Sequence, residues 1–299
     1  MRRTRGGAAA VIAGGLLILT LGGCGDSNGP DGDTLGTVEA DDVALVAGDE
    51  VEQSVAALTP EGAVTGTVEL EAAGLRVLGA IPTGAGCAEV SGGADTDGDG
   101  APDEATYTFA LPACSFTNFR GGTLEITGMI VLSDPTPVSA DFAYRAELDD
   151  FRWTYTNPDA SRSYTAVRNG TRVLSGNSAG LSLTNTVTLV RSFAGRPETT
   201  IQHNLLLGFA PAAGETLALG EPLPDGTITK SGTLIWSRNG RSRTFTVTTV
   251  VPLVWDASCT TARKIAAGEI RATLPDGSYV RTVWTGCGEE PERSFVPAE

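Results

Sequence analysis

The stretch of sequence with the clearest chemistry is DTDGDGAPD, residues 95 to 103, which holds four aspartates within nine positions. Counted from Asp95, carboxylates stand at positions 1, 3, 5 and 9, and Gly100 stands at position 6. Alternate side chains of a tight loop can turn toward one centre, and glycine permits the sharp bend that this requires. Four carboxylates at this spacing repel one another unless a cation lies between them. The loop therefore predicts a site for a hard divalent cation.

The spacing resembles the first part of the EF-hand calcium loop, and the wording DTDGDGAPD resembles the calcium repeats of the thrombospondin type 3 family. The resemblance implies structural calcium of weak affinity, with oxygen ligands from Asp95, Asp97, Asp99, the Ala101 carbonyl and Asp103. Position 12 is Thr106 where the EF-hand has a bidentate glutamate, and Glu104 at position 10 would replace it. The residues that follow, ATYTFAL, predict a strand rather than a helix. The alternative is a solvated acidic turn that binds no ion.

A second motif, GNSAG at residues 176 to 180, fits the G-x-S-x-G pattern of the hydrolase nucleophile elbow. That elbow needs a helix after it, whereas LSLTNTVTLV predicts a strand, and no aspartate lies between Ser178 and the single histidine, His203. We therefore expect an ordinary turn, a structural histidine and a protein that is not an enzyme. Four tryptophans are expected in the core, with a ligand-lining role as the alternative: Trp153, Trp236, Trp255 and Trp284.

The N-terminus has the three parts of a bacterial secretion signal: three arginines, an apolar run over residues 8 to 21, and Leu21-Gly22-Gly23-Cys24. Small residues directly before a cysteine resemble the lipobox of bacterial lipoproteins. The resemblance implies that Cys24 becomes the first residue and carries acyl chains such as palmitate, which anchor it in a membrane. Because Gly25 follows rather than aspartate, it suggests the outer membrane, on its periplasmic face or at the cell surface. An ordinary secretion signal and an uncleaved anchor are the alternatives.

Removal of residues 1 to 23 leaves 276 residues with 18 basic and 36 acidic side chains, a net charge of −18. Such a chain repels phosphates, so nucleic acid is not an expected partner. Four cysteines remain: Cys87, Cys114, Cys259 and Cys287. Disulfides persist in exported proteins, and we favour the pairs Cys87–Cys114 and Cys259–Cys287 because each closes a local loop of similar size. A metal site is disfavoured, since the chain has no C-x-x-C and one histidine.

Residues 25 to 36, GDSNGPDGDTLG, are expected to form a flexible tether after Cys24. Residues 39 to 58 predict a short N-terminal helix from the spacing of their valines, and we group residues 37 to 120 as a helix and calcium-loop region. Residues 121 to 299 are expected to be an antiparallel β domain.

Alternation of apolar and polar residues marks the strands, as in SLTNTVTLV and RTFTVTTVVPL. Short turn sequences separate them, above all Asn239-Gly240, with LPDGSY, NPDAS, RNGT and FAGRPE as further expected reversals. About nine strands from residue 122 to 286 predict a mainly β, up-and-down meander that forms a half-barrel, barrel or sandwich.

Taken together, the sequence predicts a membrane-anchored envelope lipoprotein that acts as a non-enzymatic binding or structural protein, with a protein or apolar ligand as partner. The alternative is a periplasmic carrier of an apolar ligand or lipid. A curled meander with an N-terminal helix resembles, at the level of fold alone, the half-barrels of Lol-type lipoprotein carriers.

Overall fold

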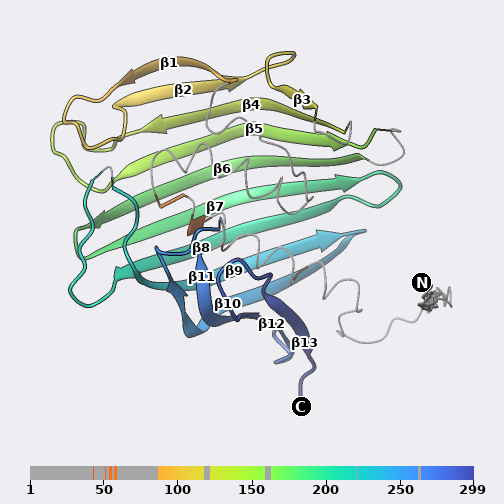
Figure 1. Ribbon diagram of the computed structural model, residues 1–299. Coiled ribbons are helices and arrows are strands. Elements are labelled where there is room, and N and C mark those ends of the chain that lie inside the picture. The colour runs from red at the N-terminus through yellow and green to blue at the C-terminus, as the bar shows by residue number, and fades with distance from the viewer. Residues whose placement is uncertain are drawn as a thin grey trace, which may run out of the picture. The chain divides into compact units, whose positions relative to one another are not determined.

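The computed structural model describes residues 43, 51, 54–55, 57–58, 87–117, 122–158, 163–219, 221–261 and 264–299. Within these ranges thirteen strands form one sheet (Figure 1). The strands are β1 (Glu89–Ala94), β2 (Glu104–Phe109), β3 (Ser115–Thr117), β4 (Thr123–Ser133), β5 (Tyr144–Thr156), β6 (Ser163–Asn177), β7 (Gly180–Phe193), β8 (Thr199–Pro211), β9 (Gly226–Arg238), β10 (Arg241–Trp255), β11 (Ile265–Thr273), β12 (Tyr279–Trp284) and β13 (Glu292–Val296).

The order of strands in the sheet follows the order of the chain, from β1 and β2 through β4 to β13, and the neighbours pair antiparallel. The short strand β3 pairs with the first residues of β4, while β2 pairs with the rest of β4. The predicted up-and-down meander is confirmed, and β4 to β12 are the nine strands expected between residues 122 and 286. The sheet is not closed, because β1 and β13 stand at its two ends.

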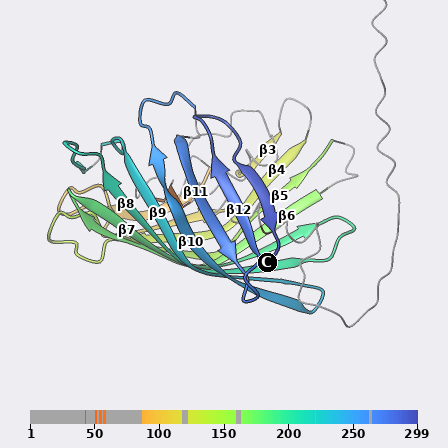
Figure 2. The same ribbon diagram turned by 90° about the horizontal axis from the view of Figure 1, so that it is seen from below.

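The sheet twists and curls along its length. Strands β1 to β8 run across the view in Figure 1, whereas β11 to β13 run steeply through it, and the view from below in Figure 2 shows the strands bending. Glycines inside the strands permit close contact at two places: a Cβ on Gly170 would lie 2.2 Å from the carbonyl oxygen of Thr186, and one on Gly232 would lie 2.2 Å from that of Asn204. Bulges and such glycines are what curves a sheet.

Several predicted reversals are confirmed. Asn239 and Gly240 join β9 to β10 with φ of 53° and 74°, as a two-residue hairpin of type I′ requires. FAGRPE connects β7 to β8, and LPDGSY connects β11 to β12. Part of NPDAS lies outside the described residues.

The predicted reversal at RNGT is wrong, because residues 168 to 171 lie inside β6. Asn169 faces a register shift in β5, where Asp150 has a φ of 43°. The Asn169 side chain accepts a hydrogen bond from the Asp150 amide at 2.8 Å and donates one to its carboxylate at 3.2 Å. The polar pair therefore serves a β-bulge between two strands rather than a chain reversal.

One face of the sheet, called the inner face below, carries the alternate buried side chains and forms a single core cluster. The described residues of the expected N-terminal helix join this cluster: Val43, Val51 and Val55 are helical and buried, and Leu58 follows them. The hydroxyl of Tyr144 in β5 donates a hydrogen bond to the carbonyl of Ala57. The ends of this helical segment lie outside the described residues. No described helix is long and apolar enough to span a membrane.

A meander places every second connection at the same end of its sheet. One end of the sheet therefore carries six connections: β1–β2, β4–β5, β6–β7, β8–β9, β10–β11 and β12–β13. The β1–β2 connection lies on the left of Figure 1. We call this end the cavity end. Hydrogen bonds join some neighbouring connections there: the Leu217 amide donates to the Ser178 carbonyl at 3.0 Å, and the Ala257 amide donates to Asp225 Oδ1 at 2.8 Å. Residues far apart in the sequence thus become neighbours at this end.

A buried carboxylate clamps two of the last strands together. Glu269 in β11 is 7% exposed and lies 2.7 Å from Arg271 Nε and 2.8 Å from the nitrogen Nη2 of Arg281 in β12. The hydrogen bond from Arg281 and the two positive charges hold the pKa of Glu269 below its ordinary value, although burial opposes them. Arg145 and Glu147 in β5 also form an arginine–glutamate ion pair, but both side chains are exposed, at 46% and 51%.

We expect Glu269→Gln to lower the free energy of unfolding at pH 7 by about 1–2 kcal/mol, because two half-exposed arginines lose a buried partner. The matched control Glu147→Gln should cost about 0–1 kcal/mol. Because the folded pKa of Glu269 is lowered, its stabilisation is present above the unfolded glutamate pKa of about 4.3 and is lost as pH falls through the folded pKa. Urea unfolding of both variants at pH 7 and pH 3 measures this, and equal losses for the two at pH 7 would contradict it.

Candidate metal centre and adjoining cavity

The acidic stretch forms the loop of a β-hairpin. Pairing of β1 with β2 sets Ala94 opposite Glu104, so residues 95 to 103 must turn between them. Gly98 and Gly100 have φ of 76° and 92°, a region that side chains rarely adopt, and this explains the glycines at these two positions. The ATYTFAL segment is strand β2, as predicted.

Three of the predicted ligands come together. Asp95, Asp97 and Asp99 each place a carboxylate oxygen within 4.8 Å of those of the other two. Asp95 is fixed by the loop itself, since its Oδ1 accepts from the Gly98 amide at 2.7 Å and its Oδ2 accepts from the Gly100 amide at 3.0 Å. These bonds hold the loop in a shape that gathers the three carboxylates.

The other predicted ligands lie differently. Asp103 accepts two hydrogen bonds from Thr96, at 3.0 Å from the amide and 2.6 Å from the hydroxyl, and these lower the pKa of Asp103. It therefore closes the loop rather than joining the carboxylate group. Glu104 is the exposed first residue of β2, and Ala101 is buried with its amide 2.8 Å from Asp99 Oδ1.

Two further carboxylates, which the sequence analysis missed, reach the loop from the β4–β5 connection. Asp134 and Asp141 form a second group with Asp99, again with oxygens within 4.8 Å of one another. The Asp141 amide donates to Asp99 Oδ2 at 3.2 Å, and the Asp134 amide donates to the Pro102 carbonyl at 2.9 Å. Asp99 is therefore shared by two carboxylate groups on two connections.

Burial and like charges act together on Asp99, which is 4% exposed. Burial is the largest cause that raises its pKa, and the charges of Asp97 and Asp134 raise it further, while hydrogen bonds from the amides of Ala101 and Asp141 lower it. An oxygen-only, anionic cluster of this kind suits hard cations such as calcium.

A cavity of about 440 Å³ adjoins these carboxylates at the cavity end. Asp99 and Asp141 form part of its wall, and most of the remainder is aliphatic. The aliphatic lining comes from the turn residue Leu58, from β6 and β7, and from the β8–β9 connection: Leu58, Leu174, Leu181, Leu217, Leu219 and Leu223. The volume lies within the range of about 300–1,000 Å³ typical of small-molecule pockets.

Both predicted disulfide pairings are confirmed. Cys87–Cys114 ties the start of β1 to the β2–β3 connection and so brackets the acidic hairpin. Cys259–Cys287 joins the β10–β11 and β12–β13 connections at the cavity end.

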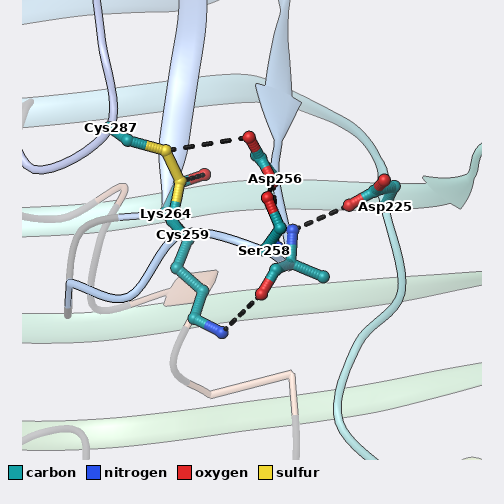
Figure 3. The surroundings of a disulfide bond; sticks show 7 residues. Asp225, Asp256, Ser258, Cys259, Lys264 and Cys287 are labelled. Atoms are coloured by element: carbon teal, nitrogen blue, oxygen red, sulfur yellow. Dashed lines mark hydrogen bonds between the residues drawn. A yellow bond between two sulfur atoms is a disulfide. The ribbon is translucent and has the colours of Figure 1, made fainter.

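Figure 3 shows the surroundings of the second disulfide. Asp256 Oδ1 accepts from the amide and hydroxyl of Ser258 at 2.9 and 2.6 Å, while the Lys264 ammonium donates to the Ala257 carbonyl at 3.2 Å. The hydrogen bonds from Ser258 lower the pKa of Asp256. Asp256 approaches both cysteines, but their sulfurs are bonded to each other, so this group offers no thiolate to a metal.

The residues of the rejected catalytic motif lie in a hairpin. β6 ends at Asn177 and β7 begins at Gly180, so GNSAG is followed by a strand rather than by the helix of a nucleophile elbow. His203 lies in β8 and is 2% exposed on the inner face. Trp153, Trp236 and Trp284 are buried in the core as predicted, and Trp255 is partly buried with the Lys264 ammonium 5.8 Å from its ring.

A buried polar band, which was not predicted from the sequence, lies on the inner face. Its members share strands β6 to β9 and are at most 2% exposed: Arg168, Arg172, Asn185, His203 and Lys230. The alternation of β6 places both arginines inward, a signal that was hidden because RNGT was interpreted as a turn.

No family model matches the chain, and neither a curated protein nor a solved structure matches it significantly.

Proposed function

We propose that the protein is an exported lipoprotein, anchored in the outer membrane through Cys24, whose sheet acts as a non-enzymatic binding or structural protein. The observation that carries the proposal is the single meander of thirteen strands in the described ranges, with its connections joined at one end around a cavity. The hairpin setting of GNSAG and the burial of His203 support a role without catalysis. The arginines, apolar run and LGGC of the N-terminus support export and lipidation.

Cys24→Ser is expected to move the protein from the membrane fraction to the soluble fraction of a bacterial host, because acyl chains are the proposed attachment. Fractionation with immunodetection measures the change. Intact mass spectrometry of the wild-type protein should find Cys24 as the first residue with added acyl mass. A wild-type protein that retains residues 1 to 23 would contradict lipidation.

The hairpin loop is proposed to hold structural calcium. Asp95, Asp97 and Asp99 support this, because their oxygens lie within 4.8 Å of one another on a loop whose backbone bonds preset its shape. The ion would make the loop rigid rather than take part in a reaction, since the loop joins two strands and the disulfide Cys87–Cys114 brackets it. An ion here would offset the mutual repulsion of the three carboxylates.

With a dissociation constant of about 10⁻⁴–10⁻³ M, 10 mM calcium should stabilise the fold by about 1.4–2.7 kcal/mol. Asp97→Asn should reduce this gain, while Asp149→Asn, which changes an exposed acid of β5, should leave it unchanged. Thermal unfolding with calcium and with a chelator measures the effect. A wild-type melting temperature that does not respond to millimolar calcium would exclude the ion.

A second candidate function is transport of an apolar ligand or lipid, and the aliphatic cavity of about 440 Å³ favours it. The β8–β9 connection contributes one side of this cavity, with Ala218 at an exposed position. Ala213 is also exposed on the same connection but does not line the cavity, so it offers a matched control.

For a carrier, native mass spectrometry after mild extraction should find co-purified lipid, and a fluorescent fatty acid should bind the purified protein. Ala218→Trp should weaken that binding at least about tenfold by filling the cavity mouth, whereas Ala213→Trp should not. Fluorescence titration measures both. A bare mass together with no binding of the fatty acid would reject the carrier.

A further inference from the structure

The second carboxylate group, formed by Asp99, Asp134 and Asp141, is more deeply buried than the loop group. Asp99 is 4% exposed and Asp134 is 6% exposed. The three side chains come from two connections that the pairing of β2 with β4 brings side by side. Burial of several like charges in one place is costly unless a partner of opposite charge is present.

The hydrogen bonds of Asp134 leave one of its two carboxylate oxygens without a donor in the described part of the chain. Its Oδ1 accepts from the amide and hydroxyl of Thr136, at 2.7 and 3.4 Å, whereas its Oδ2 is enclosed and has no hydrogen-bond partner in the described part of the chain. Asp141 shows the same division, because its Oδ2 accepts from the Thr136 hydroxyl at 2.6 Å and its enclosed Oδ1 has no such partner there. An enclosed carboxylate oxygen without a donor is an open ligand position.

Two hydrogen bonds hold the β1–β2 and β4–β5 connections together at this group. The Asp134 amide is bound to the Pro102 carbonyl and the Asp141 amide to Asp99 Oδ2, at 2.9 and 3.2 Å. The three ion pairs Arg145–Glu147, Arg271–Glu269 and Arg281–Glu269 do not involve this group. Amide and hydroxyl donors therefore offset only part of the negative charge that is gathered here.

The oxygens of the three carboxylates lie close enough together to bind one ion. Calcium binds oxygen at about 2.3–2.6 Å, so two ligands on opposite sides of one ion lie about 4.6–5.2 Å apart. The three carboxylate oxygens lie within 4.8 Å of one another, and calcium tolerates the irregular geometry of ligands from two connections.

We propose a second calcium position, bound by Asp99, Asp134 and Asp141, which shares Asp99 with the hairpin loop. It goes beyond the loop ion proposed above, because two of its three ligands come from the β4–β5 connection. Since Asp99 and Asp141 also line the cavity, the ion fixes the part of the cavity wall where the two connections meet.

Isothermal titration of the calcium-free mature chain with calcium tests the two positions separately. The wild type should bind two ions, Asp134→Asn should bind one in the loop, and Asp97→Asn should bind one in the second position. Asp141→Asn is a second variant of the same position at a less buried residue, for use where Asp134→Asn fails to fold. Asp149→Asn is the control and should bind two ions.

Wild-type stoichiometry and affinity in both Asp134→Asn and Asp141→Asn would overturn the second position and leave the loop ion standing. The second position would also be overturned if the wild type bound a single ion that was lost both in Asp97→Asn and in Asp134→Asn or Asp141→Asn. One ion would then be bound by both carboxylate groups. An ion lost in Asp134→Asn but retained in Asp97→Asn supports the second position, even where the loop binds nothing. No calcium binding by the wild type would overturn both.

Discussion

Backbone pairing between consecutive strands is the constraint on which the rest of this protein depends. Each hairpin supplies the next edge, so the sheet grows in chain order and needs no crossover. Side chains alternate across it, which collects the core on the inner face and leaves the other face more exposed to solvent, as the burial of β8 shows residue by residue. An open sheet of this width must curve, and Gly170 and Gly232 allow the close backbone approaches that curvature requires.

Much of this fold could be predicted because its determinants are local. Alternation in SLTNTVTLV and the pair Asn239-Gly240 depend on residues close in sequence, so they indicate β7 and the β9–β10 turn directly. The prediction of a turn at RNGT was wrong for a physical reason. Asn and Gly suit a β-bulge as well as a turn, and pairing with the neighbouring strand decides which of the two forms. The burial of the β6 arginines was not predicted for the same reason, because a strand interrupted by a turn would not place both of them on the inner face.

The carboxylates of the candidate metal centre also fall into those that could be predicted from the sequence and those that could not. Asp95, Asp97 and Asp99 could be predicted together because one short loop orients all three. Asp134 and Asp141 could not, because their place depends on which strands pair, and an acid beside Pro135 indicates only a turn. Asp103 fits the ligand spacing but is bound by Thr96, a local competition that a spacing pattern does not represent.

The meander also explains why the charges meet where they do. Alternate connections must share the cavity end, and elsewhere along it the neighbours attract: an amide meets a carbonyl at Leu217 and Ser178, and a disulfide joins Cys259 to Cys287. At the meeting of the β1–β2 and β4–β5 connections, backbone bonds instead hold carboxylates against one another. Repulsion there opposes the pairing of β2 with β4, and the proposed cation would offset it. Asp99 belongs both to these carboxylate groups and to the wall of the adjoining cavity, so the pairing of the two connections also positions part of that wall.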